Sequence, residues 1–150
     1  MQKITPFLWF DKKAEEAAKF YCSIFKNSKI IKISRDGKKV WCVTFRLNGL
    51  ELIAFNGGPH FKFTHAISLF VDCKTQREVD GFWDKLSKGG EKGQCGWLKD
   101  KYGLSWQIVP SILGQLLKDK NPAKSERVYN AMLKMTKIDI KTLKQAYNQK

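Results

Sequence analysis

The fold of this chain is decided by the stretch Thr64-His65-Ala66-Ile67-Ser68-Leu69-Phe70-Val71-Asp72. Its apolar run predicts a buried strand that begins at His65 and ends at Asp72, and a helical pattern follows over residues 75–86. Residues 4–11, and the helical pattern that continues to residue 25, repeat this design. The sequence therefore predicts two copies of one structural module.

Each module is predicted to contain one strand, one helix and three further strands. In the first module, strands over 4–10, 29–35, 40–47 and 50–55 are interrupted by Asp-Gly and Asn-Gly turns, which are typical of tight hairpins. Asp11 is expected to cap the first helix, and Thr75 with Glu78 matches a capping box for the second. Strands over 95–99 and 104–109 complete the second module.

Aligning the two modules puts Ile4 on His65 and Asp11 on Asp72, and the closing hairpins put Ile53 on Gln107. The predicted fold class is α+β, with two tandem βαβββ modules that form a curved, open-barrel sheet around a shared interior. We expect a single domain with module one over 1–56, module two over 60–110 and a helical extension over 111–150. The apolar stripe of this extension is expected to pack on the domain or on a second subunit.

The net charge of +14 arises from 28 basic and 14 acidic side chains. Because the lysines are interleaved with acids along the whole chain, we expect a solvated basic surface, with nucleic-acid association as the second alternative only. No apolar run reaches the length of a membrane span. A cytoplasmic location with free thiols is expected from the scattered cysteines, which are Cys22, Cys42, Cys73 and Cys95.

Several motifs resemble the PhnB-like branch of the vicinal oxygen chelate superfamily, which includes glyoxalase I, bleomycin-resistance proteins and extradiol dioxygenases. They are FNGGP (55–59), HAISLFVD (65–72), FWDKL (82–86), QCGWLKDKYGLSWQ (94–107) and the tail over 127–141. Close relatives carry the label 3-demethylubiquinone-9 3-methyltransferase. The sequence gives that label no support, because Gly57-Gly58 is followed by Pro59 rather than by the helix of a nucleotide-binding loop.

The resemblance implies a divalent metal ion, which would be held by side chains from the first and last strands of each module. Transferring those positions gives Ile4, Ile53, His65 and Gln107. Isoleucine has no donor atom, so only His65 and Gln107 are metal candidates, and a divalent ion is the alternative to having no cofactor. Without a metal, His65 would hydrogen-bond Gln107 or the main chain at a cavity wall, or act as the candidate catalytic acid–base group.

A small organic ligand is the expected partner, because rings that line a cavity favour planar ligands. The primary hypothesis is therefore a small-molecule binding protein that forms a homodimer and has no assignable reaction. The alternative is a metal-dependent isomerase, lyase or dioxygenase, and the sequence does not decide whether the protein is an enzyme. The residues expected to line the ligand cavity are His65, Gln107, Trp9, Phe55, Trp97 and Trp106.

Overall fold

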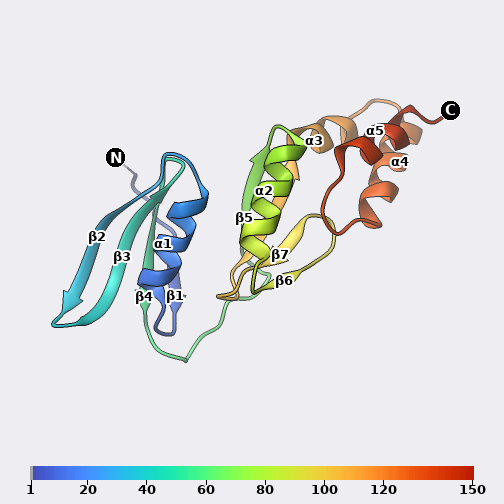
Figure 1. The fold of residues 1–150 in the computed structure, drawn as a ribbon. Helices are drawn as coiled ribbons and strands as arrows, with labels where there is room; N and C mark the ends of the chain where they lie inside the picture. The colour runs from blue at the N-terminus through green and yellow to red at the C-terminus, as the bar shows by residue number, and fades with distance from the viewer. Residues whose placement is uncertain (1) are drawn as a thin grey trace. The chain divides into compact units, whose positions relative to one another are not determined.

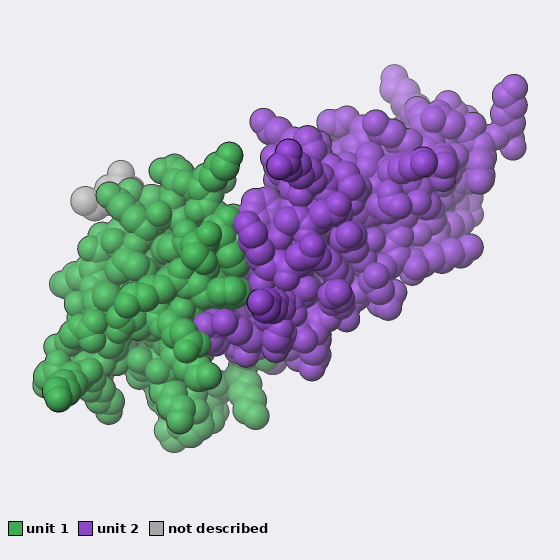
Figure 2. All heavy atoms as spheres, viewed as in Figure 1, with its two compact units in different colours: residues 1–63 green, residues 64–150 purple. Residues whose placement is uncertain are grey.

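A computed structural model describes residues 2–150 of the chain. The fold divides into two compact units, residues 1–63 and residues 64–150, which Figure 2 draws in green and purple. Each unit contains a four-stranded sheet with a helix packed on it (Figure 1). The predicted α+β class and the order of strand, helix and three strands are confirmed in both units. The single-domain division with its module boundaries, and the shared interior, stay predictions.

Unit 1 begins with β1 (Phe7–Phe10) and α1 (Ala14–Ile24), followed by β2 (Lys29–Asp36), β3 (Lys39–Leu47) and β4 (Leu50–Asn56). The strand order is β1-β4-β3-β2, and β1 pairs with β4 in parallel while the other pairs are antiparallel. One face of this sheet is buried against α1, where the rings of Tyr21 and Phe45 stack 6.3 Å apart. The opposite face is the open face of unit 1.

Unit 2 repeats this connectivity with β5 (Ser68–Cys73), α2 (Gln76–Ser87), β6 (Glu91–Lys92), β7 (Trp97–Lys99) and β8 (Ser105–Pro110). Its strand order is β5-β8-β7-β6, again with the first strand parallel to the last. The short β6, which pairs with β7, is the third strand expected after the helix, but its position was not predicted. The core between α2 and the sheet is built from Trp83, Leu98, Trp106 and Ile108.

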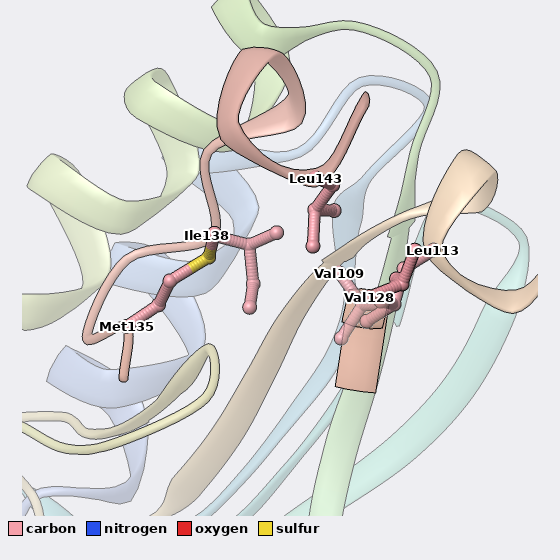
Figure 3. Close-up of a cluster of buried hydrophobic side chains, with 6 residues drawn as sticks. All are labelled: Val109, Leu113, Val128, Met135, Ile138 and Leu143. Atoms are coloured by element: carbon pink, nitrogen blue, oxygen red, sulfur yellow. The ribbon is translucent and has the colours of Figure 1, made fainter. Parts of the chain in front are cut away.

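The C-terminal extension forms α3 (Ser111–Leu117), α4 (Pro122–Leu133) and α5 (Ile140–Asn148), and it belongs to unit 2. Asn121 and Asp139 cap α4 and α5 with their side chains, and Pro122 occupies the first turn of α4, where a missing N–H costs nothing. Figure 3 shows the apolar cluster that joins this extension to the end of β8: Val109, Leu113, Val128, Met135, Ile138 and Leu143. None of the helices in residues 2–150 is long and apolar enough to cross a membrane.

Two local predictions about helix starts have different outcomes. Thr75 caps α2 as predicted, since its hydroxyl oxygen accepts a hydrogen bond of 3.2 Å from the N–H of Glu78. The prediction that Asp11 caps α1 is wrong. The N-cap residue is Lys13, and the N–H of Ala14 donates instead to the side-chain oxygen of Asn56 at 2.8 Å. The cap of α1 therefore comes from the end of β4, a partner that no local pattern identifies.

The predicted alignment of the two opening strands is wrong by two residues. Phe7 pairs with Ile53 in unit 1, whereas Phe70 pairs with Gln107 in unit 2. Because Ile53 and Gln107 are equivalent in the closing strands, Phe7 corresponds to Phe70, and the two are 57% and 58% exposed. The strand predicted to begin at His65 begins at Ser68, so His65 lies in the turn before β5.

The corrected alignment puts Gln2, not Ile4, on His65. The hydrogen bonds agree: the Gln2 amide donates to the carbonyl of Glu51 at 2.8 Å and accepts from its N–H at 3.0 Å. His65 bonds Ser105, the equivalent of Glu51 in unit 2. In both units a side chain before the first strand therefore ties that segment to the start of the last strand.

Candidate functional site

The two polar residues predicted for a site, His65 and Gln107, both lie at the open face of the unit 2 sheet. Strand alternation sends neighbouring residues to opposite faces, and residues paired across strands share a face. Leu69, Leu98 and Trp106 are register partners on the face buried against α2. The open face of unit 2 therefore includes Ser68, Phe70, Trp97, Ser105 and Gln107, together with Asp72, Lys99 and Val109.

His65 lies over this face and is held by two contacts. Its Nδ1 and the hydroxyl oxygen of Ser105 form a hydrogen bond of 2.8 Å, and its ring meets the Trp97 ring edge-on at 5.9 Å and 86°. His65 is exposed, and Nε2 makes no hydrogen bond within the described part of the chain. The ring is thus oriented through one nitrogen while the other is available to an incoming molecule.

Gln107 is on the same face, but His65 bonds the Ser105 hydroxyl rather than Gln107 or the main chain, the two partners that were predicted. The side-chain nitrogen of Gln107 donates to the hydroxyl oxygen of Ser68 at 3.0 Å. Trp97 links the two residues, since its ring contacts His65 and its main chain is the register partner of Gln107. The structure therefore brings His65, Trp97 and Gln107 together. Ser68 and Ser105, which orient Gln107 and His65, were missed because serine carries no distinctive sequence signal.

Trp106 is separated from this group. Its side chain is 2% exposed on the helix-covered face, and its Nε1–H donates to the carboxylate of Asp100 at 2.9 Å. The same carboxylate accepts the main-chain N–H groups of Tyr102 and Leu104 and so shapes the β7–β8 turn. Trp106 is a core residue. Residues 106 and 107 are neighbours on a strand, so their side chains point to opposite faces of the sheet and cannot both line one cavity on it.

Trp9 and Phe55 lie on the open face of unit 1 and form an aromatic cluster there. Phe55 contacts Phe7 at 5.3 Å and Trp9 at 5.1 Å, and Trp9 meets Phe61 edge-on at 4.9 Å. The Trp9 indole N–H donates to the carbonyl of Gly58 at 2.9 Å, which anchors the segment after β4. A Cβ atom at Gly57 would overlap the Trp9 ring, so glycine is required there for space.

A groove of about 880 Å³ in unit 1 contains none of the predicted site residues. It lies between the start of α1, the β2–β3 turn and residues 56–58, and lysines and acids line it together. Glu15, which lines the groove, pairs with Lys19 at 2.8 Å and with Arg35 at 3.2 Å. The hydrogen bond from Lys19 and the charge of Arg35 lower the pKa of Glu15. The groove is therefore a solvated ion-pair surface.

The donor atoms of the chain do not fit a resident metal ion. Structural and catalytic metal centres use three or four protein ligands. Among residues 2–150 no group of three or more His, Cys, Asp and Glu side chains converges. Ile53 has no donor, and both ends of the Gln2 amide already bond Glu51. This leaves one imidazole and one amide, His65 and Gln107, so no reaction step is assigned to a metal.

Comparison with known proteins identifies the family. A sequence model described as 3-demethylubiquinone-9 3-methyltransferase matches residues 2–109, and the PhnB protein from Bacillus cereus is 40% identical. This chain belongs to that family. The match with the B. cereus structure covers 73% of this chain and 100% of that one, with a TM-score of 0.70. The family description names a reaction, but Gly57-Gly58 is followed by residues 59–67, which form no helix, whereas a nucleotide-binding glycine loop leads into one.

More distant structures establish the fold alone. A glyoxylase/bleomycin resistance protein/dioxygenase domain from Frankia is 13% identical, with a TM-score of 0.50 over 73% of this chain and 92% of that one. The fosfomycin resistance protein FosX from Listeria monocytogenes, solved with Mn(II) and sulfate, is 18% identical, with a TM-score of 0.53 over 70% of this chain and 88% of that one. A search of curated proteins found no match. The chain is a PhnB-like member of the glyoxalase/bleomycin-resistance fold.

Proposed function

We propose that the protein binds a small planar organic molecule on the open face of unit 2. The observation that carries this proposal is the contact of His65 with Ser105 and Trp97 on the face that also presents Gln107. An oriented imidazole, an aromatic ring and an amide on one face match the composition of small-molecule sites, in which a few polar groups orient a ligand beside rings.

His65 would make the orienting hydrogen bond through Nε2. Ser105 fixes the imidazole through Nδ1, and which nitrogen carries the proton in the neutral ring decides whether Nε2 donates or accepts. A ligand with an oxygen beside a flat ring system could use this nitrogen while its ring lies against Trp97 or Phe70. No metal enters the proposal, because His65 and Gln107 alone do not make a metal centre. The same geometry would allow His65 to exchange a proton with a bound ligand.

The proposal includes a homodimer in the cytoplasm. Phe7 and Phe70 are more than half exposed on the two open faces, which leaves apolar surface for a second copy to cover. All four cysteines are free, which suits a reducing compartment. Light scattering of purified protein at micromolar concentration tests the dimer, and a monomeric mass would refute it.

Naphthalene-2-carboxylate is a suitable probe, because it combines a flat ring system with an oxygen acceptor. In two-dimensional NMR spectra we expect it to shift the indole N–H of Trp97 and the side-chain amide of Gln107. His65→Ala should weaken its binding roughly ten- to a hundredfold, since a hydrogen bond to a charged group contributes roughly 1.5–3 kcal/mol. His60→Ala is the matched control, because His60 is an exposed residue of the stretch of sequence that connects β4 to β5. Shifts confined to Trp9, or equal affinity in both variants, would refute the proposed site.

A further inference from the structure

The C-terminal extension clamps the turn that precedes Trp97. The N–H of Cys95 donates to the carbonyl of Met135 and the N–H of Gly96 to the carbonyl of Thr136, both at 2.8 Å. On its other side, Gly96 accepts a 2.8 Å hydrogen bond from the N–H of Ile108 in β8. Residues 95 and 96 are therefore fixed between the last strand of the sheet and the segment that joins α4 to α5.

The conformation of this turn leaves little freedom. Gly96 has a φ of +84°, and a Cβ atom there would lie 2.8 Å from the carbonyl oxygen of Ile108 and 3.1 Å from the side chain of Ile138. Cys95 has a φ of +57°, which is uncommon for a residue with a side chain and persists only when its surroundings impose it. The surroundings include the extension, so the extension helps to set the direction in which the chain enters Trp97.

Gln76 attaches the clamp to α2. Its side-chain nitrogen donates to the carbonyl of Ile138 at 3.0 Å, and its side-chain oxygen accepts from the N–H of Ile140 at 2.8 Å. The same nitrogen donates to Asp80, which pairs with Lys137 at 2.9 Å. Ile138 is fully buried between these contacts and Val109. The Gln76 amide thus holds both ends of the segment 138–140. The residues just before this segment, Met135 and Thr136, are those that bond the turn at Cys95 and Gly96.

We propose that the extension, held by Gln76, positions Trp97 against His65 and is thereby part of the ligand site. The ligand part of this inference rests on the function proposed above. Val109 lies two residues beyond Gln107 on β8, so alternation puts it on the open face, and the extension covers it. The extension therefore bounds the site at its β8 end. The extension lies outside the residues that the family model matches, which end at residue 109.

The chain has only two histidines, so proton NMR can follow the clamp without labels. In Gln76→Ala the carbon-bound ring protons of His65 should move toward their positions in Trp97→Ala, because the Trp97 ring no longer holds its edge-on place. His60 should not move, and it serves as the internal reference. The matched control is Gln145→Ala, which makes the same chemical change at an exposed position on α5 and should leave both histidines unchanged.

Binding of naphthalene-2-carboxylate is measured separately, and Gln76→Ala should weaken it about three- to tenfold. Unchanged His65 resonances in a folded Gln76→Ala protein would overturn the inference even if the wild type binds the probe at Trp97. Moved resonances with no probe binding to the wild type would support the clamp and refute the proposed function. If Gln76→Ala does not fold, Gln76→Glu replaces it, because Glu keeps the acceptor for Ile140 and loses the donor to Ile138 and Asp80. A smaller shift of the His65 resonances in Gln76→Glu supports the inference, and the absence of any shift overturns it.

Discussion

The two units share one connectivity but present different chemistry on their open faces. In unit 1 the positions of Gln107 and Trp97 are taken by Ile53 and Thr44, beside the aromatic cluster around Trp9 and the ion pair of Arg46 with Glu51. In unit 2 the same framework carries hydroxyl, amide and imidazole groups. The buried faces are alike because the helix must cover an apolar surface in both. A repeated fold therefore preserves its core face, while its open face is free to differ.

The segments that follow the last strands extend this comparison. After β4, the chain turns back so that Gly58 bonds Trp9 and Phe61 packs on its ring. After β8, the chain continues into the extension that covers Val109. Each unit thus closes one end of its open face with whatever follows its last strand. Only in unit 2 is this end covered by helices, and the segment between two of them also bonds the turn that precedes Trp97.

The largest expected effect compares equivalent core residues. Leu52 and Trp106 occupy the same place in the two closing strands, and both are buried under a helix. Leu52→Ala should lower the free energy of unfolding by about 2–5 kcal/mol through cavity formation. Trp106→Ala should cost more, about 4–7 kcal/mol, because it also removes a hydrogen bond from the buried Asp100 carboxylate. Urea unfolding measures both free energies, and a loss for Trp106→Ala no larger than that for Leu52→Ala would contradict the prediction.

The helix caps give a smaller contrast in the opposite direction, because here the larger loss of stability is expected in unit 1. Asn56→Ala removes the bond to the N–H of Ala14 and the bond to the carbonyl of Val40, so we expect a loss of about 1–3 kcal/mol. Thr75→Ala removes one local cap and should cost about 1 kcal/mol. Thermal unfolding followed by circular dichroism ranks the two variants. A larger loss for Thr75→Ala would mean that the long-range cap of α1 is dispensable.

The smallest effect concerns thiol reactivity. Burial, with smaller contributions from the charges of Glu78 and Asp72, raises the pKa of Cys73 to about 12. At pH 8 we expect Cys73 to resist alkylation by iodoacetamide in the folded protein and to react once it is unfolded. Because the folded pKa exceeds the unfolded value, this thiol stabilises the fold below the unfolded pKa of 9.0, and that contribution is lost as the pH rises toward 12. Mass spectrometry would contradict this if Cys73 were alkylated as fast as Cys42.

Much of this architecture is local and could be predicted from the sequence. Strand alternation, the Asp-Gly and Asn-Gly turns, and the caps Thr75 and Asp139 act over a few residues, so the element order follows from them. The resemblance of the motifs identified the family. His65 and Gln107 were predicted together from positions that the resemblance transfers, and Trp97 was one of four aromatic residues expected at the cavity. The structure brings Trp97 to His65 and Gln107 but places Trp9, Phe55 and Trp106 elsewhere.

Tertiary structure decided what depends on register and on distant partners. A two-residue difference in pairing makes Gln2, rather than Ile4, the counterpart of His65, and a hydrophobic pattern of period two cannot distinguish registers that differ by two. The cap of α1 by Asn56 and the bond of His65 to Ser105 join residues about forty positions apart. The clamp on Trp97 likewise requires residues 76, 96 and 138 to meet. The sequence by itself determined the elements and the apolar faces that fold them, and packing alone decided which polar side chains meet on the face left open.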